Sequence, residues 1–154
     1  MQEHIPLDDL EIYQIAMEIG DIIWEKVDGW NSFAQRTVGE QIVRSGDSIA
    51  ANIAEGYGRF FFKERKQFCY YGRGSLLETK TWVTKAFRRK LIAEQEYSLI
   101  LEKLQNLHYK INIYIKKLRQ DQNKPGYPNI PISQYHITNS PPPPISHPCS
   151  LPGG

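Results

Sequence analysis

The side chains best suited to chemistry lie between residues 44 and 59, where polar groups recur at helical spacing. At 100° per residue, Arg44, Ser48, Asn52 and Glu55 fall on one narrow stripe of a helix. Neighbours on this stripe stand three or four residues apart, and side chains at that spacing on a helix can interact. The stripe could therefore form part of a catalytic site or a hydrogen-bonded network.

Catalysis would require a nucleophile beside a base, or two carboxylates that face one cleft. No histidine accompanies Ser48 or Ser75, and Asp47 lies on a different helical face from Glu55. We therefore interpret the stripe as a structural polar network, joined by Ser75 and Glu78 of the next helix, that fixes the register of the two helices. No catalytic residue is predicted, and the protein is not expected to be an enzyme.

A second group of side chains combines positive charge with aromatic rings and surrounds the three phenylalanines at positions 60–62. Cationic groups bind phosphate and aromatic rings stack on bases, so this composition is typical of nucleic-acid binding. The alternative is helix packing or a subunit contact for the phenylalanines and a solvated surface for the cations. The residues predicted to bind nucleic acid are Arg59, Lys63, Arg65, Lys66, Arg73, Arg88, Arg89 and Lys90.

The net charge of +2 conceals a segregation of charge along the chain. Residues 1–35 carry eight acids and one base, whereas residues 36–119 carry seventeen bases and eight acids. A positive segment of this kind suits an anionic partner. The acidic first part could equally complement its basic neighbours within the fold.

The composition argues against several classes of protein. Cys69 and Cys149 are the two cysteines, too few for a disulfide framework or a zinc site, and the four histidines lack the spacing of metal ligands. No apolar run approaches the ~18 residues of a transmembrane helix. The acidic N-terminus also lacks the features of a secretory signal. We expect a cytoplasmic protein without a metal or other cofactor.

Four helices must position these side chains, and the last is the clearest. Its apolar residues recur at spacings of four and three for three heptads, which is typical of a helix packed at a shallow angle on its neighbours. A second row widens the apolar face beyond the needs of a two-stranded coiled coil and favours a bundle. His108 is expected to be a core histidine. The first row is Tyr97, Leu101, Leu104, His108, Ile111, Ile115 and Leu118; the second is Ile100, Leu107 and Tyr114.

The first helix is predicted over residues 8–28, with Asp8 as its N-cap and Glu11 completing a capping box. It carries two apolar stripes, which one partner helix cannot cover together. One stripe could therefore face another subunit. The stripes are Leu10, Tyr13, Met17, Gly20 and Trp24, and Ile12, Ile15, Ile19 and Ile22.

The second helix is predicted to begin at Ser32, with Gln35 completing a capping box, and to end in the left-handed conformation at Gly56 and Gly58. Small residues beside its apolar arc should let a neighbouring backbone approach closely. The third helix is predicted over residues 63–89. Its inner side is expected to carry Phe68, Tyr71, Ser75, Leu76, Thr79, Trp82, Val83 and Ala86.

No strand-like alternation persists, and the connections are short, so sequential helices should be antiparallel. The predicted fold is all-α: an antiparallel up-down four-helix bundle over residues 1–120. Residues 121–154 hold nine of the ten prolines and are predicted to form a disordered proline-rich tail. This tail is either an unconstrained terminus or a segment that docks into an aromatic groove.

Several stretches together resemble a known family, the small four-helix-bundle proteins encoded within intervening sequences of bacterial 23S ribosomal RNA genes. They are residues 9–13 (DLEIY), 41–45 (QIVRS), 48–59 (SIAANIAEGYGR) and 74–78 (GSLLE), together with Phe68. The sequence departs from the family at residues 46–47, where alanine and a small or apolar residue are more usual, and at residues 70–73.

The resemblance implies a homo-oligomeric ring, a pentamer, with no established enzymatic activity. The chain is also similar to accessory proteins of diversity-generating retroelements, which bind a reverse transcriptase and nucleic acid. Two functions follow as hypotheses. The first is a non-catalytic oligomer that binds structured RNA, or DNA, through its basic surface. The alternative is a protein-interaction scaffold that recruits a reverse transcriptase or another enzyme.

Overall fold

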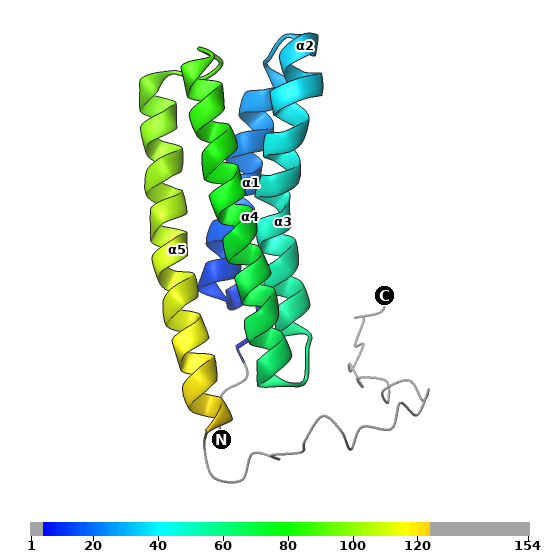
Figure 1. The fold of residues 1–154 in the computed structure, drawn as a ribbon, viewed down its shortest axis with the longest axis vertical. Coiled ribbons are helices and arrows are strands. Elements are labelled where there is room, and N and C mark those ends of the chain that lie inside the picture. The colour runs from blue at the N-terminus through cyan, green and yellow to red at the C-terminus, as the bar shows by residue number, and fades with distance from the viewer. Residues whose placement is uncertain (1–4, 124–154) are drawn as a thin grey trace, which may run out of the picture.

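A computed structural model describes residues 5–123, which form a bundle of four long helices (Figure 1). Short connections reverse the chain after each long helix, so helices adjacent in the chain run antiparallel (Figure 1). The predicted all-α up-down bundle is confirmed. The four long helices are α1 (Glu11–Asp28), α3 (Glu40–Tyr57), α4 (Phe62–Arg88) and α5 (Glu94–Gln122).

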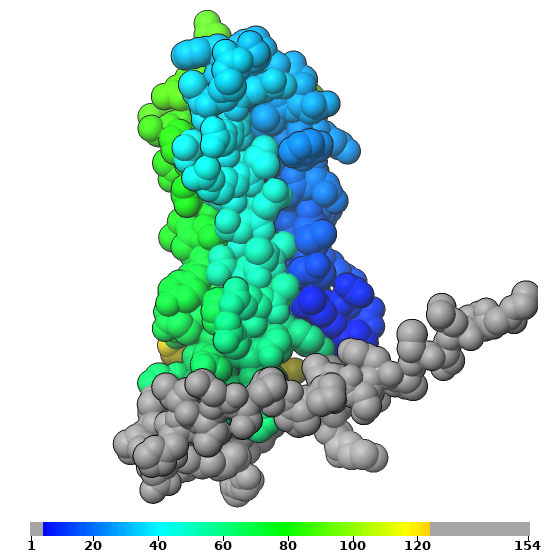
Figure 2. Space-filling view, turned by 90° about the vertical axis from the view of Figure 1, so that its right-hand side faces the viewer, coloured from blue at the N-terminus to red at the C-terminus, as the bar shows by residue number. Residues whose placement is uncertain are grey.

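The helices are arranged as a closed ring in which α1 contacts α3 and α5, and α4 contacts the same two helices. Figure 2 shows α1 and α3 side by side along the length of one face of the bundle. Helix α5 continues to Gln122, two residues beyond the predicted end of the bundle. The predicted disordered tail otherwise lies outside the described residues.

The core is built from the apolar rows that the sequence predicts. Val38, Ile42, Ile49 and Ile53 are all buried on the inner side of α3 and of the turn before it. In α5 the two predicted rows supply six buried side chains, while the remaining members are half-buried at the margins. His108 is one of these marginal residues, so the expectation of a core histidine is wrong. The buried members are Ile100, Leu104, Leu107, Ile111, Ile115 and Leu118.

The predicted inner row of α4 is confirmed in its second half, where Leu76, Thr79, Val83 and Ala86 are buried, and is wrong in its first half. Tyr71 is 52% exposed, whereas Cys69 and Gly72 occupy the inward positions. Gly72 lies against the α3 backbone, where an added Cβ would stand 3.5 Å from the carbonyl oxygen of Ile49. Small side chains face α3 because the two helices are so close, and the larger aromatic ring is displaced outward. The buried row of α4 is Cys69, Gly72, Leu76, Thr79, Val83 and Ala86.

The start of α1 differs from the prediction. A short 3-10 turn, Leu7–Asp9, precedes the helix, and Leu10 stands at the N-cap position without a side-chain cap. The predicted capping box of Asp8 is therefore wrong. The carbonyl oxygen of Asp8 instead accepts a hydrogen bond of 2.8 Å from the side chain of Gln14.

The chain between α1 and α3 forms a single turn of helix, α2 (Ser32–Ala34), followed by a π-helical segment, η2 (Gln35–Gly39). The α2 cap is Asn31, whose Oδ1 accepts from the backbone N–H of Ala34 at 3.0 Å. The predicted capping box of Ser32 and Gln35 is wrong because the Gln35 amide points back to α1. It donates to the carbonyl oxygen of Val27 at 3.2 Å.

The two glycines at the end of α3 have other roles than the predicted left-handed cap. Gly58 has φ −72° and ψ −9°, which is right-handed. Gly56 is buried inside the helix, where an added Cβ would lie 2.8 Å from Cβ of Phe68. This glycine therefore permits the close approach of α3 and α4.

The left-handed conformation occurs instead at the end of α4. Lys90 has φ 61°. Its N–H donates to the carbonyl oxygen of Phe87 at 2.9 Å, and the N–H of Leu91 donates to that of Ala86 at 3.0 Å. This pair of bonds is the Schellman arrangement, which usually places glycine at the left-handed position.

Candidate nucleic-acid interface

The residues predicted to bind nucleic acid lie at two ends of the bundle. Arg59, Lys63, Arg65 and Lys66 surround the turn from α3 to α4, with Arg73 two turns further along α4. The other three stand at the end of α4, where Arg88 is its last residue and lies roughly 22 Å beyond Arg73 at ~1.5 Å per residue. Arg88, Arg89 and Lys90 are all exposed there. The eight cations therefore form two separate surfaces.

Two cations beside the turn between α3 and α4, Arg59 and Arg65, help to fix that turn. Arg59 forms an ion pair with Glu55, and its guanidinium lies 4.8 Å from the centre of the Phe68 ring. Arg65 donates through Nε to the carbonyl oxygen of Arg59 at 2.6 Å. Its guanidinium lies 5.5 Å from the centre of the Phe62 ring. These arginines thus pack on aromatic rings, whereas the structural alternative expected the cations to form a solvated surface.

Three other cations line the outer junction of α4 and α5, and neutral side chains hold each of them. Lys66 Nζ donates to Oε1 of Gln122 at 2.6 Å, and Arg73 Nη1 donates to Oδ1 of Asn112 at 2.8 Å. From the other helix, Arg119 Nη2 donates to the hydroxyl of Tyr70 at 2.6 Å. We call this group the cationic seam: Lys66, Tyr70 and Arg73 of α4 with Asn112, Arg119 and Gln122 of α5.

The partners in the cationic seam are amides and a phenol, so they orient the cations without neutralising them. The guanidinium of Arg73 also lies 5.1 Å from the centre of the Tyr70 ring. Positive charge with a fixed direction beside an aromatic ring suits a phosphate backbone.

Helix α5 adds cations that the sequence-based site omitted. Lys116 and Lys117 are exposed, and Arg119 belongs to the cationic seam. Between residues 103 and 120 the sequence contains five bases and no acid. This acid-free run was the signal that could have identified these residues.

The opposite side of α5 carries ion pairs with α1. Lys103 pairs with Glu18 and Lys110 pairs with Glu11, each at 2.7 Å. Lys26 of α1 pairs with Glu96 of α5 at 2.6 Å. The acidic first helix therefore does complement a basic neighbour, and it does so on the side away from the cationic seam.

The Lys26–Glu96 pair also stabilises the start of α5. The side-chain hydrogen bond from Lys26 and the backbone N–H of Ala93 hold the pKa of Glu96 below its ordinary value, and the same pair raises the pKa of Lys26. The N–H of Ala93 donates to Oε2 of Glu96 at 2.9 Å.

The predicted polar network does not join α3 to α4. Arg44 donates to Glu40 at 3.0 Å, while Ser48 and Asn52 donate to backbone carbonyls of α3 one turn earlier. On α4, Glu78 accepts from Trp82 Nε1 at 3.4 Å, and the carbonyl of Ser75 accepts from Thr79 at 2.7 Å. Each bond stays within its own helix, so these side chains do not fix the register of α3 on α4, whereas Gly56 and Gly72 lie directly against the neighbouring helix.

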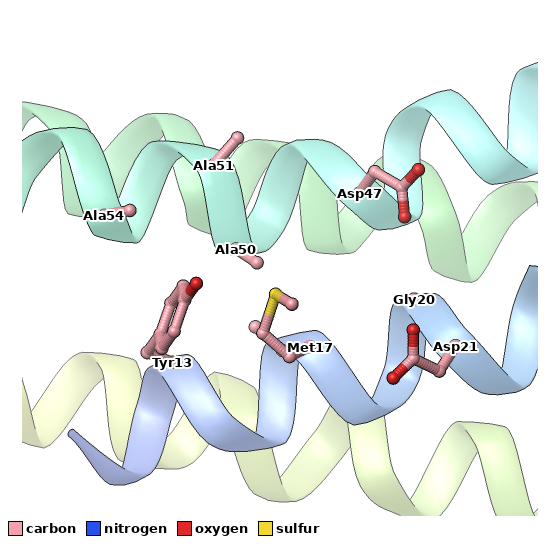
Figure 3. Close-up of a pocket in the computed structure, with 9 residues that line it drawn as sticks. Tyr13, Met17, Gly20, Asp21, Asp47, Ala50, Ala51 and Ala54 are labelled. Carbon is pink, nitrogen blue, oxygen red and sulfur yellow. The ribbon is translucent and has the colours of Figure 1, made fainter. Parts of the chain in front are cut away.

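A pocket of about 280 Å³ lies between α1 and α3 (Figure 3). Its walls are Tyr13 and Met17 on one side and a row of alanines on the other, with Asp21 and Asp47 at one end. Burial raises the pKa of Asp47, and the charge of Asp21 raises it further. None of the residues of the predicted polar network lines this pocket.

A second pocket, of about 320 Å³, lies between α4 and α5 above the cationic seam. Among residues 5–123, no group of three or more His, Cys, Asp or Glu side chains could hold a metal ion. None of the helices in this range is both long enough and apolar enough to cross a membrane.

Comparison with known proteins places the chain in a family. Residues 8–113 match the family model described as 23S rRNA-intervening sequence protein. The fold is similar to the crystal structure of a protein with unknown function from the S23 ribosomal protein family of Bacteroides thetaiotaomicron, at 21% identity and a TM-score of 0.62. That match covers 68% of this chain and 98% of the other. No curated protein matches. Because the family model spans most of the bundle, the chain belongs to the 23S rRNA-intervening sequence protein family.

Proposed function

We propose that this protein is a non-catalytic bundle protein that binds structured RNA through the cationic seam and the exposed Lys116 beside it. The observation that carries the proposal is the difference between the two sides of α5. Towards α1, lysines pair with carboxylates. Towards α4, Lys66, Arg73 and Arg119 bond to neutral groups and keep their charge available to an anion.

Structured RNA suits this surface because phosphates supply the anionic charge and the A-form backbone is recognised mostly by shape. The charged cluster at the far end of α4 lies outside the cationic seam, about 22 Å beyond Arg73 at ~1.5 Å per residue. The proposal therefore assigns phosphate binding to the cationic seam and treats Arg88, Arg89 and Lys90 as a solvated surface.

Binding should be measured by fluorescence anisotropy with a labelled RNA hairpin at several salt concentrations. The triple variant Lys66→Gln, Arg73→Gln, Arg119→Gln should lose at least about tenfold in affinity at moderate salt, and its log–log salt slope should fall by roughly two to three. The matched control is Arg88→Gln, Arg89→Gln, Lys90→Gln, which removes the same charge. Equal losses of affinity in both variants would contradict the proposed binding surface. If the unmodified protein retained neither RNA nor DNA at low salt, the proposed function itself would be contradicted.

We also propose that the protein forms a homo-oligomeric ring, namely the pentamer that the family resemblance implies. Met17 and Trp24 of α1 support this, because they lie on one of the two predicted apolar stripes of this helix and are 44% and 61% exposed. Light scattering should give about five times the chain mass of 17.9 kDa. A mass of one chain would remove the ring.

The scaffold function, including recruitment of a reverse transcriptase, stays a prediction from resemblance. A pull-down that recovers a protein partner, combined with no retention of nucleic acid, would favour it over RNA binding.

A further inference from the structure

The pocket between α4 and α5 has no part in the phosphate contacts proposed above. Its floor is apolar and includes the buried side chains of Leu76 and Leu104. The polar side chains of its lining come from both helices and end in three different groups: the ammonium of Lys80, the amide of Gln105 and the imidazole of His108. The complete lining is Leu76, Leu77, Lys80, Leu101, Leu104, Gln105 and His108.

The position of this pocket continues the cationic seam by one heptad. On α4, Lys66, Arg73 and Lys80 are each seven residues apart, which places them on one face at intervals of ~10 Å. On α5, Gln105 stands seven residues before Asn112, the partner of Arg73. A nucleic-acid strand whose phosphates follow the seam would therefore bring its next nucleotide over the pocket.

The chemistry of the lining suits the ring of a nucleobase. Leucine side chains can contact the face of the ring, and an imidazole such as His108 can stack on a base or bond to it. The Gln105 amide can both donate and accept along a base edge. Lys80 can meet the phosphate of the same nucleotide. A base within a paired helix cannot enter the pocket, since its edge and both faces are occupied.

We infer that the α4–α5 pocket binds an unpaired nucleobase, a bulged or loop nucleotide of the RNA held by the cationic seam. The inference rests on the proposed function and deepens it, because it names the RNA feature that the surface selects. The seam supplies affinity that depends on salt, and the pocket supplies a preference for unpaired bases that depends little on salt.

The test compares a hairpin carrying one bulged 2-aminopurine with a fully paired hairpin of the same length. The bulged RNA should bind the full-length protein about tenfold more tightly, and its 2-aminopurine fluorescence should change on binding. The double variant Gln105→Ala, His108→Ala should remove this preference and leave the salt slope unchanged. The matched control is Asn106→Ala, Tyr109→Ala, two exposed positions on the same helix outside the pocket.

The outcomes separate the two claims. Equal affinity for bulged and paired hairpins, with normal salt dependence, would overturn the base pocket and leave the proposed function intact. Retention of neither RNA would overturn both. Circular dichroism and thermal melting of each variant show whether a lost preference reflects misfolding, and the fluorescence change in the unmodified protein tests the pocket without any substitution.

Discussion

At the scale of single residues, Lys90 occupies a backbone conformation that favours glycine. It is the one described non-glycine residue with positive φ. The left-handed region is unfavourable for residues with a Cβ, because the Cβ crowds the backbone. The lysine at this position therefore lowers the free energy of unfolding, and it adds one exposed cation at the end of α4.

We expect Lys90→Gly to stabilise the bundle by about 0.5–1 kcal/mol, because glycine adopts this conformation without strain. Lys90→Ala, which keeps the Cβ, serves as the control and should give no gain. Urea denaturation followed by circular dichroism measures both. A loss of stability in Lys90→Gly would mean that the lysine side chain contributes more than its backbone costs.

Asp47 offers a residue-scale test of the α1–α3 pocket. Its folded-state pKa lies above the ordinary value of 3.8. The folded protein thus holds this proton more tightly than the unfolded chain, so ionisation above about pH 4 lowers the free energy of unfolding.

Asp47→Asn should therefore stabilise the protein at pH 7, by no more than roughly 0.5 kcal/mol because the carboxyl remains in contact with water. The gain should shrink as the pH falls from 7 towards 3.8 and be absent below that value, where the aspartate is protonated in both the folded and the unfolded state. Thermal melting of both proteins between pH 3 and pH 7 measures the difference. A gain that does not change with pH would rule out the carboxylate charge as its source.

Cys69 is buried on the inner side of α4, and burial raises the pKa of its thiol to about 12. Since the thiolate is the reactive form, the folded protein should be nearly inert to a disulfide reagent such as DTNB at pH 8. In a Cys149→Ser protein, Cys69 is the remaining cysteine, and its reaction should proceed at the rate of opening of the bundle. Rapid reaction without denaturant would contradict this burial.

Residue identity predicted the cations of the site and missed their partners. The hydrogen-bond partners of the cations are the neutral side chains of Tyr70, Asn112 and Gln122, and nothing in the sequence alone distinguishes them from other polar residues. They become meaningful only when α4 and α5 bring them within 2.8 Å of a cation. Their positions depend on how two helices far apart in the chain face each other, and that relation is not local.

At the scale of elements, the approach of α3 to α4 depends on glycines within the helices. An alanine Cβ at Gly56 would lie 2.8 Å from Cβ of Phe68 and 3.2 Å from the carbonyl oxygen of Arg65. The neighbouring backbone would have to move, because neither atom is the end of a flexible side chain.

Gly56→Ala should destabilise the bundle by about 1–3 kcal/mol, the range for overpacking a core. Gly74→Ala is the matched control, since an added Cβ meets nothing within 4 Å there. In the exposed interior of α4 this control should stabilise by about 0.5–1 kcal/mol. Chemical denaturation measures both, and equal effects of the two substitutions would refute the role of close helix approach.

Periodicity predicted the long helices well because each has a sustained apolar row. It was correct for the second half of α4 and failed for the first, where Phe68 and Tyr71 are larger and more apolar than Cys69 and Gly72. Size favours the aromatic residues as core, but α3 lies so close to this part of α4 that Cys69 and Gly72 take the inward positions. The predictions that Asp8 and Ser32 cap helices were also wrong. Both have side chains that can cap a helix, but the N-cap positions are occupied by Leu10 and Asn31 instead.

At the scale of the whole molecule, charge is divided between the two sides of α5. The side towards α1 is neutralised by Glu11 and Glu18, and the side towards α4 remains positive. The sequence predicted the segregation and left both explanations open. Complementation within the fold is confirmed by the pairs of Lys103 and Lys110 with α1, and the anionic partner stays a prediction.

The closed ring of helices also has a consequence for the order in which the molecule folds. Helices α3 and α4 pack on their neighbours in the chain across short turns, whereas α1 and α5 must meet across more than sixty intervening residues. Closing that long loop carries the largest entropic cost of any helix contact. Lys103 and Lys110 pair with α1 at this last junction. The contact between α1 and α5 is thus the one that completes the ring, whereas α4 and α5 are joined by a short turn and can form the cationic seam before the ring closes.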